Sequence, residues 1–253
     1  MKYALLLLVI LSTSLASAHE VQFIGQHLDI RRQKETGWQS DVLARATLSR
    51  KFEVGLQGTY LERFDFHEKR GGALLSYQPK ENIILEGKIL LGNGNEILPN
   101  QDYFLNGFWG LSDGFSPFFF YRNTNFSETH VQSVRVGLEI EKVSGFIIIP
   151  TFLTGKATFN SPASTKNIHN YGLKLVYYRE AHYSFGIFGY KGKEASQGII
   201  GTSNFLVDTT TGGVSASYYF IPSLRSEIIF DYTDYHELKN QFLTTTLNLA
   251  WRF

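Results

Sequence analysis

Hydrophobic and polar residues alternate along most of this chain, and that period of two limits its fold more than any other feature. Between Val134 and Glu141, valine, leucine and isoleucine fall on one face, while Arg135 and Glu139 fall on the other. Because alternate side chains of a strand point to opposite faces, such segments are predicted to be strands with one polar face. Beyond Leu11 no apolar run reaches the roughly 18 residues of a membrane-spanning helix, which excludes a helical membrane protein.

The alternation predicts fourteen antiparallel strands in an all-β fold. They are expected at 20–31, 39–49, 52–62, 70–78, 82–91, 102–111, 115–124, 131–141, 145–155, 169–179, 183–192, 210–220, 224–234 and 242–253. A tilted membrane strand needs about 9–11 residues, which these segments supply. Twelve strands is the alternative count, because Val21 to Arg31 alternates poorly and the first pair is the least well marked.

The connections between these strands are short and long in turn. The short ones lie around 50–51, 79–81, 112–114, 142–144, 180–182 and 221–223, and the others are 32–38, 63–69, 92–101, 125–130, 156–168, 193–209 and 235–241. Outer-membrane barrels have short periplasmic turns and longer extracellular loops, whereas a soluble sandwich has no reason to sort its loops in this way. The pattern therefore predicts one transmembrane β-barrel in the bacterial outer membrane, with an even strand number and both termini in the periplasm.

The N-terminus has the order of a secretory signal peptide. Met1 and Lys2 give a positive start, an apolar run extends from Tyr3 to Leu11, and small residues end at Ala18. The run is too short to anchor the chain as a membrane helix. We expect residues 1–18 to be cleaved and residues 19–253 to form a single barrel domain, which without cysteine contains no disulfides.

The net charge and the aromatic content limit the classes of partner that this chain is expected to bind. The net charge of +1 gives no electrostatic case for nucleic acid. Aromatic residues make up 15% of the chain, and several lie near strand ends on the face expected to point outward. These are Phe52, Tyr60, Tyr77, Tyr103, Trp109, Phe220, Tyr232, Trp251 and Phe253. Such rings suit the two membrane interfaces, so outer-membrane lipid is the expected partner of this face.

The opposite face of the strands carries charges of both signs. We expect these residues to point into the lumen: Arg45, Glu53, Glu86, Lys88, Arg135, Glu139, Glu141, Lys174, Glu227, Asp231 and Arg252. On the lipid side an Arg or Lys at the midplane costs about 2–4 kcal/mol. The charges form either a salt-bridge network that plugs the barrel or the lining of a polar pore. Fourteen strands lie between the small filled barrels and the open porins, and a narrow or plugged lumen is slightly favoured.

Motifs of enzyme chemistry are weak. Residues 110–114 match G-x-S-x-G, but a strand-like segment follows where the nucleophile motif needs a helix, so a tight turn is expected. The glycine-rich stretch at 92–95 lacks the third glycine of a dinucleotide site. The seven histidines are scattered, and neither a metal nor another cofactor is expected. Loops 156–168 and 193–209 are expected to bind surface glycan, to fold in as a constriction, or simply to connect strands.

The closing strand ends in a recognisable pattern. Leu247, Leu249, Trp251 and Phe253 share the outward face, and a terminal aromatic on such a strand is the expected signal for the barrel-assembly machinery. Together with two hairpins, LARATLSRKFEVGLQGTYLERF at 43–64 and GLEIEKVSGFIIIPTFLTG at 137–155, the strand LTTTLNLAWRF resembles the YaiO family of outer-membrane β-barrels. The resemblance covers most of the chain after residue 18.

This resemblance implies a non-enzymatic outer-membrane barrel. Some members of the family occur with tetratricopeptide regions or near glycosyltransferases, which implies a link to polysaccharide export. The family contributes no catalytic motif. The expected function is therefore a narrow conduit or a surface-binding component linked to polysaccharide, and the alternatives are an outer-membrane lipid-modifying enzyme and a purely structural, plugged barrel.

Overall fold

The structure is a computed structural model. It describes residues 19–31, 35–63, 66–93, 98–111, 114–160, 163–179, 182–195, 206–236 and 240–253. The expected signal peptide at 1–18 lies outside these residues, as do parts of several connections.

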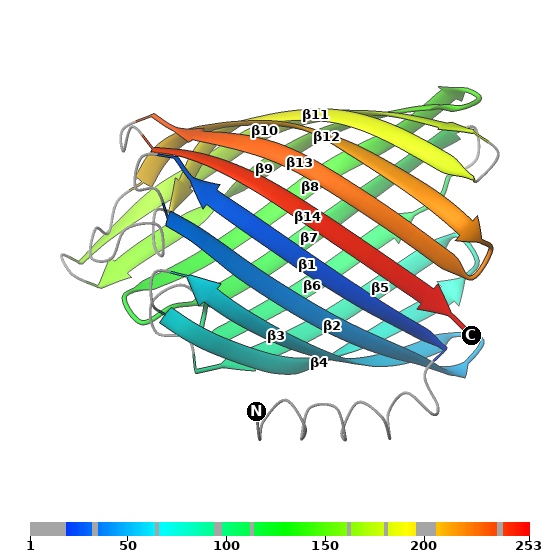
Figure 1. The fold of residues 1–253 in the computed structure, drawn as a ribbon, viewed down its shortest axis with the longest axis horizontal. Coiled ribbons are helices and arrows are strands. Elements are labelled where there is room, and N and C mark those ends of the chain that lie inside the picture. The colour runs from blue at the N-terminus through cyan, green and yellow to red at the C-terminus, as the bar shows by residue number, and fades with distance from the viewer. Residues whose placement is uncertain are drawn as a thin grey trace.

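Fourteen antiparallel strands form one closed barrel (Figure 1). They are β1 Glu20–Ile30, β2 Glu35–Ser49, β3 Phe52–Arg63, β4 Phe66–Lys80, β5 Ile83–Gly92, β6 Gln101–Trp109, β7 Phe115–Asn125, β8 Thr129–Val143, β9 Phe146–Asn160, β10 Ala163–Arg179, β11 Tyr183–Ala195, β12 Leu206–Ile221, β13 Leu224–Tyr235 and β14 Asn240–Arg252. Each strand pairs with its neighbours in sequence, and β1 pairs with β14 to close the ring. The predicted fold class and strand count are confirmed.

The first strand pair, which the alternative count of twelve placed in doubt, belongs to the barrel. Phe23 of β1 pairs with Val42 of β2 and with Leu249 of β14. The alternation of β1 is poor because Ile24, Leu28 and Ile30 lie on the inner face, where Ile30 is buried against Phe242. An apolar residue on the inner face obscures the period of two without changing the strand.

Both ends of the described chain lie at one end of the barrel, here called the turn end; the opposite end is the loop end. The backbone N–H of Phe253 donates to the carbonyl of His19 over 3.0 Å, which joins the two ends of the barrel domain. At the turn end β8 and β9 are joined by Ser144 and Gly145, and the glycine takes a φ of 90°, which other residues rarely adopt. The tight turns expected at this end are therefore present where the chain is described.

At the loop end several strands extend beyond their predicted bounds: β2 and β4 begin inside the expected loops 32–38 and 63–69, and the largest difference is at the β9–β10 hairpin. The segment 156–168, expected to be a long loop, is strand except at 161–162, which lie outside the described residues. Thr158 pairs with Thr165, and their hydroxyls are 3.3 Å apart. Polar residues face outward here, which made the segment look like a loop. A strand that extends past the lipid carries polar residues on its outer face at no cost, because water solvates them.

The outer face of the barrel is apolar and exposed. Large hydrophobic residues that alternate outward include Leu56, Leu75, Val136, Ile148, Leu173, Ile187, Val214, Phe230 and Leu247. At the turn end Phe52, Trp109, Phe220 and Trp251 add exposed aromatic rings to this face. An apolar belt of this extent around a closed barrel requires lipid rather than water as its surroundings. The described part of the chain contains no helix long and apolar enough to cross a membrane.

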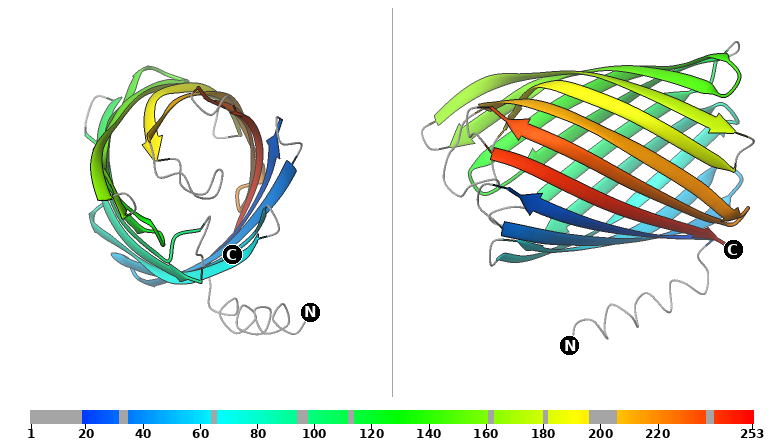
Figure 2. Two further views of the ribbon diagram at one scale, coloured as in Figure 1. Left: turned by 90° about the vertical axis from the view of Figure 1, so that its left-hand side faces the viewer. Right: turned by 45° about the horizontal axis from the view of Figure 1, so that its top comes forward.

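Apolar side chains also fill parts of the interior at the loop end. Ala157, Phe159 and Ile168 are buried together on β9 and β10, and Leu206 at the start of β12 packs against them. Figure 2 (left) looks into the loop end and shows the end of β11 turned inward inside the ring of strands. The described end of β11 therefore leans into the lumen and narrows it from one side.

Candidate functional site

The inner face of one wall, from β2 to β7, is organised around the carboxylate of Asp102. This side chain on β6 is 0% exposed. Arg122 on β7 donates to both carboxylate oxygens, with Nε–Oδ1 at 2.9 Å and Nη2–Oδ2 at 2.7 Å. Arg70 on β4 donates from Nη1 to Oδ2 over 3.3 Å, and Thr124 donates to Oδ1 over 2.7 Å. Two guanidinium groups and a hydroxyl thus satisfy one buried acid, the pairing that a buried charge needs.

The hydrogen bonds continue along the wall to β2. Arg70 Nε donates to the hydroxyl of Thr59 over 3.3 Å, and Thr59 donates to Asp41. Gln39 and Gln57 donate to the same carboxylate over 2.8 and 3.2 Å. The wall network, defined here as Asp41, Thr59, Arg70, Asp102 and Arg122 with their partners, therefore connects β2, β3, β4, β6 and β7.

Cations beside this network contact an aromatic ring. The ring of Phe104 on β6 has Lys88 Nζ 4.4 Å from its centroid and the guanidinium carbon of Arg122 5.1 Å from it. No ion pair among the described residues includes Lys88. Arg122 is bound to Asp102, whereas Lys88 pairs with no carboxylate among the described residues and is the cation of this pair more available to a solute.

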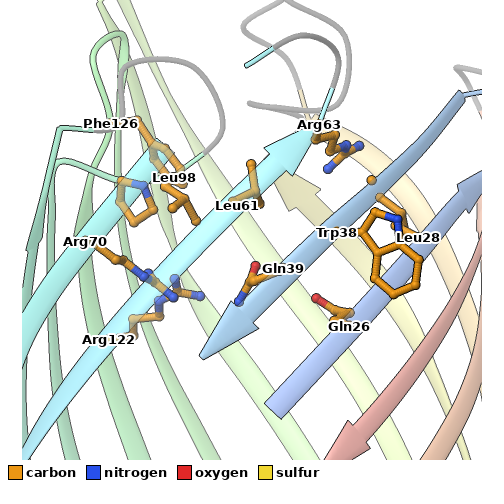
Figure 3. A pocket seen from close by; sticks show the side chains of 12 residues that line it. Gln26, Leu28, Trp38, Gln39, Leu61, Arg63, Arg70, Leu98, Arg122 and Phe126 are labelled. Atoms are coloured by element: carbon orange, nitrogen blue, oxygen red, sulfur yellow. The ribbon is translucent and has the colours of Figure 1, made fainter. Parts of the chain in front are cut away.

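A cavity of about 230 Å³ lies beside the wall network at the loop end. Figure 3 shows Arg63, Arg70 and Arg122 with Leu98 and Phe126 around it. Leu98 is 5% exposed, and its backbone N–H donates to the carboxylate of Glu68. The connection between β5 and β6, expected only as an external loop, therefore enters the lumen at Leu98 and narrows it from this side.

On β7–β8 and on β10–β12, three aromatic rings lie over glycines of the inner face. Tyr190 pairs with Gly172, Phe188 with Gly213, and Phe118 with Gly137. A Cβ on the three glycines would lie 2.1, 2.3 and 2.2 Å from the nearest ring atom respectively, so each ring covers glycine backbone. Glycine has no side chain to occupy that space, and the rings therefore lie along the wall. Phe188 and Tyr190 are neighbours, with centroids 5.6 Å apart.

Hydroxyl and amide groups cover much of the rest of the inner face. The hydroxyls of Ser184 and Ser217 are 2.7 Å apart, and those of Thr211 and Thr233 are 2.9 Å apart. Gln22 on β1 donates to Asn248 on β14 over 2.9 Å. This part of the lumen offers many neutral hydrogen-bonding groups and contrasts with the charged wall.

Six of the eleven charged side chains expected in the lumen contact an opposite charge, a hydroxyl group or an aromatic ring. Arg45 on β2 pairs with Glu86 on β5 at 2.9 Å, and Arg252 pairs with Glu20 at 2.7 Å. Glu227 pairs with Arg225 at 3.4 Å, Glu141 accepts from the hydroxyl of Tyr178, and Lys88 lies over Phe104. The strand register places five of these side chains on the inner face, and Glu141 lies in the irregular stretch between Ile140 and Val143, where no strand pair assigns its face.

The other five are Glu53, Arg135, Glu139, Lys174 and Asp231, and they also lie on the inner face by register. No ion pair joins any of them to another described residue. The expected lining therefore contains charges that pair along the wall and charges without an ion pair among the described residues. Lys88, which contacts a ring, belongs to the second set, in which Asp231 still accepts a hydrogen bond from Thr244.

The most buried part of the lining was not among the residues expected from sequence. Asp41, Arg70, Asp102 and Arg122 all lie on the inner face, and the same alternation could have placed them there. Asp41 precedes Arg45 by four residues and shares its face. Arg70 and Asp102 stood at the first residue of their expected strands, where the choice of face is least secure.

Features of an enzyme are sparse at the positions described. Ser112 and Asp113 of the G-x-S-x-G match lie outside the described residues, but Gly114 has a φ of 74° and β7 begins directly after it. A strand follows the motif, and the strand-to-helix turn of a nucleophile elbow is therefore not formed. Within the described ranges no three His, Cys, Asp or Glu side chains are grouped to hold a metal ion.

Comparison with known proteins shows which solved structures have a similar fold. No family model matches the chain, and no curated protein matches it. A solved structure titled a CymD monoaromatic hydrocarbon channel matches with a TM-score of 0.65 at 10% identity, over 94% of this chain and 89% of that one. A bacterial polysaccharide outer membrane secretin matches with a TM-score of 0.58 at 10% identity, over 94% and 99%.

A third match is a loop-deletion mutant of OmpT, an outer membrane protein of Vibrio cholerae. Its TM-score is 0.55 at 8% identity, over 92% of this chain and 98% of that one. At these identities the likeness concerns the fold. The chain therefore has the closed antiparallel barrel fold of outer-membrane proteins, and the matches do not name its family.

Proposed function

We propose that this chain is a non-enzymatic conduit of the bacterial outer membrane that passes hydrophilic solutes through its lumen. The observation that carries the proposal is the direction of the ion pairs. Arg70, Arg122 and Asp102 join β4, β6 and β7, and Arg45–Glu86 joins β2 and β5. These pairs connect strands at most three places apart, whereas opposite walls of a fourteen-stranded ring are seven places apart. They therefore stiffen a wall and do not bridge the lumen.

The location follows from the surface. The apolar belt needs lipid, and closed barrels of this kind span the outer membrane. Residues 1–18 serve as the cleaved signal peptide, and the outward residues Leu247, Leu249, Trp251 and Phe253 serve as the signal read by the barrel-assembly machinery. Trp251 and Phe253 stack with centroids 4.8 Å apart at the exposed turn end, which supports that role.

The solute we propose is polysaccharide. The resemblance of the hairpins at 43–64 and 137–155 and of the closing strand to the YaiO family supports this choice, and so does the fold likeness to a polysaccharide secretin. Membership of the YaiO family is part of the proposal. The hydroxyl and amide groups on β11–β14 and β1 would offer hydrogen bonds to sugar hydroxyls.

The test is ion conductance of the purified, folded protein in planar bilayers. We expect stepwise conductance, with a reversal potential under a salt gradient that depends on unpaired lumen charges. Arg135→Gln is expected to shift selectivity toward cations, and Glu139→Gln toward anions. The control is Lys191→Gln, which removes one positive charge, as Arg135→Gln does, but from the outer face. It is expected to change neither the conductance nor the reversal potential.

Two results would reject the conduit. Absence of conductance from folded protein would favour a plugged, structural barrel. A change in lipid A or phospholipid acylation on deletion of the gene, reversed only by active protein, would favour a lipid-modifying enzyme.

A further inference from the structure

Two separate features of the lumen suit one kind of solute, and they lie on facing walls. Lys88 is on β5, which is opposite β12 in the closed order of strands, and Phe188 lies over Gly213 of β12. Tyr190 follows on the same strand as Phe188 and lies over Gly172. A solute that contacts both walls would therefore meet a cation on one side and aromatic rings on the other.

The aromatic pair fits the ring faces of sugars. The rings of Phe188 and Tyr190 lie over glycines of the neighbouring strands, and both side chains are on the inner face and partly exposed. The face of an aromatic ring carries negative quadrupole charge, and the axial C–H groups of a pyranose carry partial positive charge. Because the rings already pack over glycines of the wall, stacking on them would cost little side-chain entropy.

The cation fits an acidic group. Lys88 is held over Phe104, whose ring also contacts Arg122, and the guanidinium of Arg122 is paired with the buried Asp102. With no ion pair of its own among the described residues, its ammonium can pair with a carboxylate on the solute. Such a charge-assisted contact inside a partly desolvated lumen is stronger than a neutral hydrogen bond.

We propose that the lumen binds carboxylated saccharides, with Phe188 and Tyr190 stacking on sugar rings and Lys88 pairing with the carboxylate. A saccharide is favoured over an aromatic acid because the hydroxyl and amide groups around β11–β14 match its many hydroxyls. The inference rests on the proposed conduit and names the class of solute that the same lumen would prefer.

The experiment uses two matched probes, cellopentaose and the same pentasaccharide oxidised to carboxylate at every C6. Block of single-channel current and binding to the folded protein in detergent are both measured. The acidic probe is expected to bind about tenfold more tightly than the neutral one. Lys88→Gln is expected to remove most of that difference and to leave the neutral probe unchanged. Phe188→Leu and Tyr190→Leu are each expected to weaken both probes about threefold to tenfold.

Matched controls change the same residue types on the outer face. Lys191→Gln and Phe185→Leu are expected to leave both affinities unchanged, because their side chains lie on the outer face. Equal binding of the two probes, or tighter binding of benzoate than of the acidic pentasaccharide, would overturn the inference while conductance still supported the conduit. Binding of the acidic probe without any conductance would reject the conduit and keep the saccharide site.

Discussion

At the scale of single residues, Asp102 shows how one buried acid can order a wall of the lumen. Its carboxylate has no exposure, and it accepts from Arg70, Arg122 and Thr124 on both sides. Arg122 remains 39% exposed, so its positive charge still reaches the lumen. The acid is thus satisfied within the wall, while part of the cationic surface remains available beside Lys88.

Replacing this acid should destabilise the barrel. Asp102→Asn keeps the shape but leaves two guanidinium groups without their carboxylate. We expect a loss of about 2 kcal/mol, because breaking a buried pair costs about 3–5 kcal/mol and the exposure of Arg122 reduces it. This change in the free energy of unfolding is measured by urea unfolding in lipid vesicles, monitored by tryptophan fluorescence. The exposed pair Lys193–Asp208 supplies the control, and Lys193→Gln is expected to cost less than about 1 kcal/mol. If Asp102→Asn unfolds at the same urea concentration as the parent protein, the wall network does not stabilise the barrel.

Glycines under the aromatic rings give a second prediction at this scale. In Gly172→Ala the new methyl group would occupy the space of the Tyr190 ring, which lies 2.1 Å from the ideal Cβ position. We expect the ring to move toward the lumen, a stability loss of about 1–3 kcal/mol from overpacking, and a smaller conductance.

The second-site change Tyr190→Ala should restore conductance in the Gly172→Ala protein, because it removes the displaced ring. Gly87→Ala is the control, since a Cβ at Gly87 meets nothing within 4 Å. If Gly172→Ala conducts like the parent protein, the ring does not lie against that glycine.

The sequence predicted which residues lie on the inner face better than it predicted which of them contact one another. Alternation gave the face of Arg45 and Glu86, but their pairing joins β2 to β5 across two intervening strands. Only the closed register brings such residues together. The sequence pattern has no means of showing which inward charges meet, and so it left paired and unpaired charges in one set.

At the scale of elements, strands were predicted well in the membrane and less well outside it. The strand cores follow the alternation of apolar and polar residues, which lipid enforces. Past the lipid both faces tolerate polar residues, and 156–168 therefore read as a loop although β9 and β10 continue through most of it. The inward course of Leu98 depends on its contact with Glu68, a pairing between β4 and a connection that no local pattern shows.

The closing strand yields a prediction about assembly. Removing Phe253 takes away the terminal outward aromatic of β14 and its stacking on Trp251. We expect the amount of heat-modifiable protein in the outer-membrane fraction to fall several-fold, because the proposed recognition signal is lost. Phe220→Ala, which removes an equally exposed aromatic ring at the same end of the barrel, is the control and should assemble normally. Normal assembly of the truncated chain would exclude Phe253 as the signal.

At the scale of the whole molecule, the barrel separates two environments across one backbone. Outward residues such as Val214 and Leu247 form the apolar belt, and their sequence neighbours Ser215 and Thr246 face the lumen. Closure of the ring pairs every strand on both sides, which removes the exposed sheet edges that lipid does not tolerate. The barrel can act as a conduit for hydrophilic solutes only if water reaches its inner face.

Cysteine accessibility measures that point directly, and the chain has no natural cysteine to interfere. Single cysteines at Ser215, Thr246, Val214 and Leu247 would be exposed to a charged, membrane-impermeant maleimide in intact outer membranes. The conduit predicts rapid labelling at Ser215→Cys and Thr246→Cys, and little labelling at Val214→Cys and Leu247→Cys, with all four labelled after denaturation. Protection of Ser215→Cys and Thr246→Cys in the folded protein would show a closed, dry interior and contradict the account.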